Sequence, residues 1–210
     1  HTDQSHQKAD TIRESTQKII EMVNRISKTI LALRVYSRSG DHDPIGAETV
    51  KTIIDSTLDI CYERLRLASI DIQTDIKPED AVILARPVQV SQILMNLLNN
   101  AHDAITSQPE MDPANKWIKV VVRETASHVE VAVLNGGPRI ADDVAEHLFD
   151  PFFTTKPIGL GTGIGLTISQ RLARANGAEL IYDRSSPATR FCLLFPRADL
   201  ELDRTPHPKT

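Results

Sequence analysis

GLGTGIGLTIS, residues 159–169, places Gly161, Gly163 and Gly165 at alternate positions directly before an apolar helical pattern. Glycine adopts positive φ without a steric penalty, and the first N–H groups of a helix have no intrahelical partner. A flexible backbone that leads into a helix N-terminus can therefore bring several N–H donors close to one anion. The spacing is neither GxxxxGKS/T nor GxGxxG after a strand, so it predicts neither a P-loop nor a Rossmann dinucleotide site.

A strongly amphipathic helix is predicted over residues 88–106. Its broad apolar face consists of Val90, Ile93, Leu94, Leu97, Leu98, Ala101 and Ile105. The opposite face carries a polar stripe of Gln92, Asn96, Asn100 and Asp103. A solvated surface explains such a stripe on most helices, but two asparagines four residues apart can also present oxygens to one hard cation or phosphate group. The helix alone leaves both interpretations open.

The other segments between residues 47 and 195 show helix and strand patterns in an order typical of an α/β sandwich. Alternating apolar residues predict strands over residues 70–76, 118–125, 128–135, 178–183 and 189–195. The second and third of these strands are adjacent, and we expect them to form an antiparallel pair. Apolar periodicity predicts further helices over residues 47–67, 140–148 and 164–175.

The N-terminal part of the chain has apolar residues at heptad spacing: Ile12, Ile19, Val23, Ile26, Ile30 and Leu33. This spacing predicts a coiled-coil-like helix that pairs most simply with a second copy of the chain, as a homodimer. SRSGDHDPIG, residues 37–46, is rich in breakers and predicts a domain boundary. The predicted fold is therefore α+β: a partial dimerisation helix in residues 1–40, a two-layer α/β sandwich in residues 41–198, and a flexible tail in residues 199–210.

Composition excludes some classes of function. The formal net charge of −4 gives no electrostatic reason to bind nucleic acid. Cys61 and Cys192 have no metal-site spacing and are expected to be reduced core thiols of a cytoplasmic protein. No apolar run is long enough for a membrane span and no signal peptide opens the chain, so no membrane contact is expected of this fragment. A sensor or membrane part of the parent protein would lie outside these residues.

Four segments resemble, in order, the sequence boxes of a known family: NLLNNAHDA (96–104), NGGPRI (135–140), LFDPFFTTK (148–156) and GLGTGIGL (159–166). They are similar to the N, G1, F and G2 boxes of the catalytic ATP-binding domain of sensor histidine kinases. That domain has the Bergerat fold of DNA gyrase, mismatch-repair ATPases and heat-shock chaperones. LRVYSR, residues 33–38, resembles the end of the second helix of the kinase dimerisation domain. The resemblance spans about residues 15–196.

The resemblance implies ATP and Mg²⁺ as ligands and assigns roles to single residues. Asn100 would bind Mg²⁺ through its amide oxygen, and Asn96 would face the phosphates, where hydrolytic relatives have a glutamate that activates water. Lys156 would reach a phosphate, although solvation alone also explains an exposed loop lysine. The glycines would wrap the triphosphate and close as a lid, which Phe149, Phe152 and Phe153 would anchor. The implied nucleotide-binding residues are Asn96, Asn100, Asp103, Asn135, Gly137, Phe153, Thr154, Thr155, Lys156, Gly161, Thr162, Gly163, Ile164, Gly165, Leu166 and Thr189.

The G1 segment departs from the family pattern Asp-x-Gly-x-Gly. Asn135 stands where the family has the aspartate that accepts a hydrogen bond from the adenine amino group, and Arg139 stands at the second glycine. An amide oxygen still accepts this bond, but a neutral acceptor makes a weaker one than a carboxylate. The Asn135 NH₂ group would then have to turn elsewhere, to Thr189 or to a water. Either departure weakens the predicted ATP binding.

The chain also lacks the family's phosphoacceptor box, which resembles His-Glu-x-x-Asn-Pro. We predict the catalytic region of a protein histidine kinase that transfers the ATP γ-phosphoryl group to a histidine on the dimerisation domain, with a response regulator as downstream partner. One alternative is a catalytically impaired, nucleotide-responsive dimerisation scaffold, which the changed G1 segment favours. Another is a serine kinase of the anti-sigma type, against which the heptad helix and LRVYSR argue.

Overall fold

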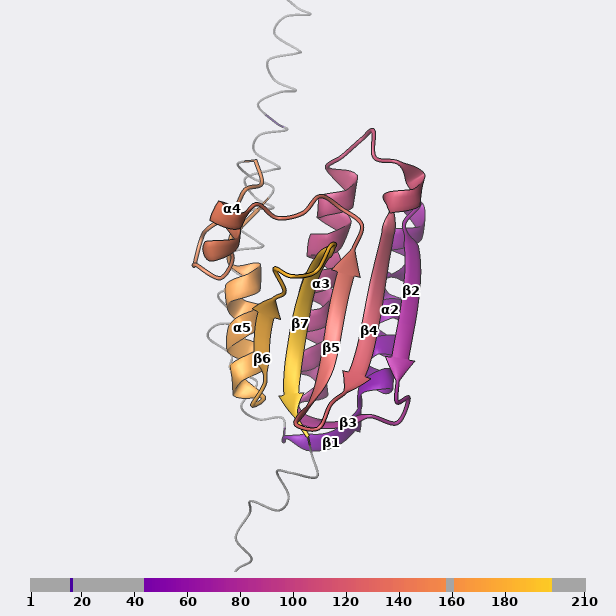
Figure 1. Ribbon diagram of the computed structural model, residues 1–210, viewed down its shortest axis with the longest axis vertical. Coiled ribbons are helices and arrows are strands. Elements are labelled where there is room, and N and C mark those ends of the chain that lie inside the picture. Colours follow the sequence, from indigo (N-terminus) through magenta and orange to yellow (C-terminus); the bar gives the residue numbers. More distant parts are fainter. Residues whose placement is uncertain (1–15, 17–43, 158–160, 198–210) are drawn as a thin grey trace, which may run out of the picture.

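The computed structural model describes residues 16, 44–157 and 161–197 of the chain (Figure 1). The heptad helix, LRVYSR and the tail 199–210 lie outside the described residues, so the predicted division into domains stays a prediction. Within the described residues, no helix is both long enough and apolar enough to cross a bilayer.

Five strands form one sheet in the order β2, β4, β5, β7, β6. The strands are β2 (Asp71–Lys77), β4 (Trp117–Glu124), β5 (His128–Asn135), β6 (Glu179–Tyr182) and β7 (Thr189–Pro196). The β2–β4 pair is parallel and the other three pairs are antiparallel. All five strands were predicted, and the antiparallel pairing of β4 with β5 is confirmed, with Val120 opposite Val133.

Helices cover one face of this sheet, which makes the expected two-layer sandwich (Figure 1). They are α2 (Val50–Leu67), α3 (Pro87–Thr106) and α5 (Gly165–Ala175), with the short α4 (Asp142–Glu146) and a 3₁₀ turn at Pro113–Asn115. Helix α3 lies between α2 and α5 and contacts both. Along β4, Ile118, Val120 and Val122 are buried while the residues between them are half-exposed, because alternate side chains of a strand point to opposite faces. The core lies between the sheet and the three long helices.

A small second sheet was missed by the sequence patterns. β1 (Gly46–Thr49) pairs antiparallel with β3 (Val82–Ala85). The predicted helix 47–67 therefore begins three residues late, at Val50, whose N–H donates to the Ala81 carbonyl at 2.9 Å. Two four-residue strands that lie far apart in the chain give too short an alternation to stand out. The backbone pairing between them exists only in the folded chain.

A buried amide network fixes α5 against α3. The Asn176 side chain follows the end of α5 and is only 4 % exposed. Its Oδ1 accepts the Arg86 N–H at 2.7 Å, and its Nδ2 donates to Gln89 Oε1 at 2.8 Å and to the Leu172 carbonyl at 2.7 Å. A fully bonded buried amide holds two elements in one arrangement, because each lost bond leaves a polar group unpaired. The N-terminus of α5 is thereby placed beside the middle of α3.

Both cysteines are free and buried, as predicted. Burial in the sheet raises the pKa of the Cys192 thiol to about 12, so this thiol is protonated and unreactive at neutral pH.

Candidate nucleotide-binding site

The polar stripe of α3 faces α5 and the segment between α4 and α5. We call that segment the lid segment; it is described over residues 147–157 and 161–164. Asn96 Nδ2 donates to Ser169 Oγ on α5 at 2.9 Å. Its Oδ1 lies so close to Gly165 that a Cβ on this glycine would be 2.5 Å from the oxygen. The stripe is therefore a contact between elements and not a solvated surface.

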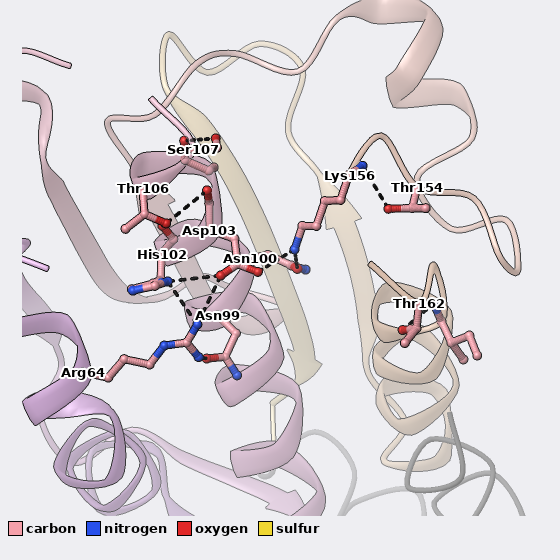
Figure 2. A network of polar contacts seen from close by, with 12 residues as sticks. Arg64, Asn99, Asn100, His102, Asp103, Thr106, Ser107, Thr154, Lys156 and Thr162 are labelled. Carbon is pink, nitrogen blue, oxygen red and sulfur yellow. Dashed lines mark hydrogen bonds and ion pairs between the residues drawn. The ribbon is translucent and has the colours of Figure 1, made fainter. Parts of the chain in front are cut away.

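One turn along α3, the stripe meets the lysine of the lid segment (Figure 2). Lys156 Nζ donates to Asp103 Oδ2 at 2.7 Å and lies 3.5 Å from Asn100 Oδ1. The Lys156 and Asp103 side chains are each 34 % exposed, so this ion pair lies at the mouth of the site. The alternative of a merely solvated lysine is wrong, because the ammonium is held against α3.

Asp103 has a second set of partners that the sequence did not indicate (Figure 2). Arg64, on α2, donates from Nη2 to Asp103 Oδ1 at 3.2 Å and from Nη1 to Asn99 Oδ1 at 2.6 Å. His102 Nδ1 lies 3.1 Å from the same Asp103 oxygen and 3.2 Å from Arg64 Nη2. Arg64 is one of several charged residues at the end of α2, and only the packing of α2 on α3 gives it this role.

The Asp103 carboxylate is ionised at neutral pH. Its partial burial by itself would raise its pKa, but hydrogen bonds from Lys156 and His102 and the charges of Lys156 and Arg64 outweigh burial, and the pKa lies below its ordinary value. The mouth of the site thus holds one carboxylate between a lysine and an arginine side chain.

The glycines of the G2 segment pack against the F segment. Gly163 has φ +64° and is so close to Phe152 that a Cβ would lie 2.3 Å from the Phe152 carbonyl carbon. The Phe152 N–H donates to the Gly163 carbonyl at 2.8 Å. A Cβ on Gly161 would lie 2.4 Å from Thr154 Oγ1. Backbone freedom is therefore required here for the close approach of two parts of the lid segment.

The G2 segment ends at the open N-terminus of α5. Ile164 occupies the N-cap position and gives no side-chain cap, so the N–H groups of the first turn, which includes Gly165 and Leu166, keep no side-chain partner within the described chain. The Ile164 N–H itself donates to Thr162 Oγ1 at 3.4 Å. Uncapped N–H groups at the positive end of an 11-residue helix, next to Asn96, suit an anionic group.

The other end of the site is formed by β5 and β7. Asn135, the last residue of β5, is 3 % exposed and pairs in register with Thr189. Its Nδ2 has no hydrogen-bond partner among the described residues. Thr189 is therefore not its partner, and the Thr189 hydroxyl donates instead to the Pro138 carbonyl at 3.1 Å. An unpaired buried amide costs about 1–3 kcal/mol, and a polar ligand would satisfy it.

Gly137 allows β5 to approach α3 beside this amide. A Cβ on Gly137 would lie 2.7 Å from Asn135 Nδ2 and 3.3 Å from the Ala104 Cβ. A cavity of about 620 Å³ adjoins this place, lined by residues 108–112, Asn115 and residues 136–138. This volume lies within the range of small-molecule sites, about 300–1,000 Å³. Sequence patterns did not predict this cavity, since the loop 107–116 has no regular pattern.

One expectation for the aromatic residues of the lid segment is corrected by the structure. Phe152 does not anchor the lid segment: its side chain is 72 % exposed and its φ is +67°. Phe149 packs against the core and Phe153 lies against the His147 ring at 5.4 Å between centroids. Arg139 donates from Nη2 to the Arg184 carbonyl in the β6–β7 turn, so it links two loops.

The two threonines of the F segment are exposed. Thr154 Oγ1 accepts the Lys156 N–H at 3.2 Å and so shapes the backbone beside the lysine.

The residues present fit Mg²⁺ as a shared ligand of protein and phosphate. The described residues contain no group of three or more His, Cys, Asp or Glu side chains that could hold a metal. Mg²⁺ binds commonly through one or two protein oxygens plus phosphate oxygens and waters. Asn100 Oδ1 is such an oxygen, and it already faces a cationic group, the Lys156 ammonium.

Residues 85–199 match the family of histidine kinase-, DNA gyrase B- and HSP90-like ATPases. The match covers more than half of the chain, and the chain belongs to this family. It is similar to C4-dicarboxylate transport sensor proteins DctB: 29 % identical over 175 residues to that of Pseudomonas aeruginosa, covering 83 % of this chain and 28 % of the relative. For Rhizobium meliloti the identity is 30 % over 188 residues, covering 90 % and 29 %. The chain thus spans less than a third of these relatives.

The fold is similar to that of solved histidine kinase domains. The nucleotide-free catalytic domain of histidine kinase ThkA is 26 % identical, with a TM-score of 0.61, covering 73 % of this chain and 95 % of that one. ThkA in its complex with response regulator TrrA gives a TM-score of 0.67 at 22 % identity, covering 87 % of this chain and 50 % of that one. The expected Bergerat sandwich is therefore confirmed.

Proposed function

We propose that this chain contains the ATP-binding catalytic region of a two-component sensor histidine kinase, which transfers the ATP γ-phosphoryl group to a histidine on a dimerisation domain. One observation carries the proposal: three successive turns of α3 each touch a different box. Asn96 touches Gly165, Asn100 contacts Lys156, and Ala104 meets Gly137. The eight residue steps from Asn96 to Ala104 span about 12 Å along the helix, at about 1.5 Å per residue. A nucleotide along this line would have its base at Asn135 and its phosphates at the lid segment.

Each end of this line suits a different part of ATP. At the base end, the Asn135 oxygen would accept the adenine amino hydrogen. The Asn135 NH₂, which has no partner among the described residues, would donate to an acceptor atom of the ligand. At the phosphate end, Lys156 and the first N–H groups of α5 bind oxyanions. Bound Mg²⁺, held by Asn100, would neutralise charge on the phosphates. Lys156 would exchange its contact with Asp103 for a phosphate oxygen.

Asn96 favours transfer to a protein over hydrolysis. An amide has no basic group with which to activate a water, and the Asn96 NH₂ is bonded to Ser169. Catalysis then depends on charge stabilisation by lid and helix N–H groups and on an acceptor brought to the site. The acceptor histidine is supplied by the dimerisation domain.

Several broader features of the whole protein belong to the same proposal. They are a cytoplasmic chain divided at residue 40 and at residue 198, a homodimer through the N-terminal helix, and a response-regulator receiver domain as partner. The sensor relatives and the solved complex of ThkA with TrrA support this choice of partner.

A second function, a nucleotide-responsive scaffold without kinase activity, is favoured by Asn135 at the base end. A neutral acceptor binds adenine less strongly than a carboxylate. Incubation with labelled ATP and a separately supplied helical acceptor domain distinguishes the two: phosphoryl transfer supports the kinase, and nucleotide binding without transfer supports the scaffold.

Calorimetric titration with Mg²⁺ and ATP tests the site itself. We expect Asn100→Ala to weaken Mg²⁺-dependent ATP binding about tenfold or more, because the metal loses its protein ligand. Gln92→Ala is the matched control, since Gln92 lies two turns earlier on the same stripe. The residue is part of the polar stripe, so its truncation opens no core cavity. Equal affinities of the two folded variants would remove Asn100 from the site.

A further inference from the structure

Arg64 lies outside all four boxes, yet it belongs to the same network as the lid lysine (Figure 2). Its guanidinium spans two positions of α3 by donating to Asn99 from one nitrogen and to Asp103 from the other. A planar guanidinium with two acceptors has little freedom to rotate, so both contacts hold its plane. The residue comes from α2 and therefore connects the far side of α3 with the mouth of the site.

The contacts of Asp103 divide between its two oxygens. Oδ1 faces Arg64 at 3.2 Å and His102 at 3.1 Å, while Oδ2 accepts from Lys156 at 2.7 Å. A carboxylate is planar, so fixing the position of one oxygen also fixes the direction of the other. The orientation that Arg64 imposes is the one that places the Lys156 ammonium beside Asn100 Oδ1.

We propose that Arg64 is a positioning residue for the phosphate end of the site: it anchors the Asp103 carboxylate so that the lid lysine lies beside Asn100. The inference rests on the proposed nucleotide function, because Lys156 is assigned to a phosphate there. The Arg64 side chain itself is 53 % exposed, and its assigned role is exerted through Asp103.

Arg64 also sets the charge of the mouth. Two cations share one carboxylate, which leaves a positive charge for an incoming anion. Without Arg64, the Asp103–Lys156 pair has no net charge. Lys156 then no longer shares the Asp103 carboxylate with an arginine, so its ion pair with Asp103 is stronger. Binding of phosphate then has to overcome the undivided ion pair. The loss must therefore grow with the number of phosphates on the ligand, and it must vanish for a ligand that has none.

The test compares Arg64→Gln with Arg66→Gln in titrations with ATP, ADP and adenosine, each with Mg²⁺. Arg66 is two residues further along α2, and its recorded contacts are with Glu63. We expect Arg64→Gln to weaken ATP binding about two- to fivefold, the range of one partly exposed charge interaction, and ADP binding by less. Adenosine affinity should equal that of Arg66→Gln. Arg64→Lys restores the charge but not the two-armed contact, so it should recover ATP affinity in part.

A second arm tests whether Arg64 acts through Asp103. In an Asp103→Asn background, Arg64→Gln should cost clearly less ATP affinity than in the wild-type background, because only the direct charge of Arg64 remains to be lost. A loss in that background as large as in the wild-type background, an equal loss for all three ligands, or no loss relative to Arg66→Gln would each overturn the positioning role. If the wild-type chain binds neither ATP nor adenosine, the nucleotide function is overturned as well. If the wild type binds ATP and Arg64→Gln binds it with the same affinity, only the role of Arg64 is overturned.

Discussion

The two ends of the site differ in burial and in charge. The base end consists of buried residues at the ends of two paired strands, and its polar group is an uncharged amide, Asn135, without a partner among the described residues. The phosphate end consists of partly exposed charged groups that are already paired with one another, the Asp103 carboxylate with Lys156 and Arg64. The amide at the base end is therefore held in place by burial but has an unpaired hydrogen-bond donor among the described residues. The charged groups at the phosphate end already have partners, which a ligand can replace. Ligand binding completes hydrogen bonds at one end and replaces an ion pair at the other.

The largest expected effect lies in the lid segment, at Gly163. Gly163→Ala places a Cβ 2.3 Å from the Phe152 carbonyl carbon and forces an L-residue into φ +64°. The lid segment must move to relieve the contact, and ATP affinity should fall on the order of tenfold or more, since about 1.4 kcal/mol corresponds to tenfold.

Gly177→Ala is the control for backbone strain in this experiment. Gly177 has φ +68°, but nothing lies within 4 Å of its Cβ position. This variant should lose only about 1 kcal/mol of unfolding free energy and keep its ATP affinity. Calorimetry and urea denaturation on both variants measure the difference. If both variants bind ATP as the wild type does, the contact between the two parts of the lid segment is irrelevant to binding.

A smaller effect is expected at the base end, from Asn135→Asp. A charged acceptor should increase the affinity for adenine nucleotides by up to about tenfold. It should lower the affinity for guanine nucleotides, because guanine presents a carbonyl at that position. The same substitution buries a carboxylate without a partner, so the unfolding free energy of the nucleotide-free protein should fall by about 1–3 kcal/mol. Titrations with ADP and GDP measure the affinity and the base preference. Denaturation without nucleotide measures the unfolding free energy. Unchanged base preference would show that Asn135 does not contact the base.

The smallest effect concerns pH and the Asp103 ion pairs. The folded-state pKa of Asp103 is depressed below 3.8, so its contribution to stability is present above that value and is lost as pH falls through the lower folded pKa. At neutral pH, Asp103→Asn should lower the unfolding free energy by less than about 1 kcal/mol, because the carboxylate is one-third exposed.

This difference between wild type and Asp103→Asn should close as the pH falls below 3.8, which urea denaturation at several pH values measures. A difference that is the same at pH 7 and at acid pH would show that the pairing of Asp103 adds nothing to stability.

Sequence patterns predicted the elements whose periodicity is long. The α3 helix, with seven apolar residues on one face, and the β4–β5 pair, with eight alternating residues each, appear within one residue of their expected bounds. The β1–β3 sheet was missed because four-residue strands carry little periodicity and their stability comes from a distant partner. The same contrast holds for the site: the boxes lie in contiguous residues, whereas Arg64 and the loop residues of the cavity lining, 108–112 and Asn115, come from segments without a motif.

The sequence by itself determined the family, the order of the elements and the candidate residues, because local spacing encodes helix faces, strand alternation and glycine positions. Only the tertiary structure decided which of those residues meet. It placed Asn96, Asn100 and Ala104 against three different boxes, gave Lys156 its contact with Asp103, and left the Asn135 amide unpaired among the described residues. These outcomes depend on how α2, α3 and α5 pack on the sheet, and packing is set by surfaces that come together only when distant parts of the chain fold.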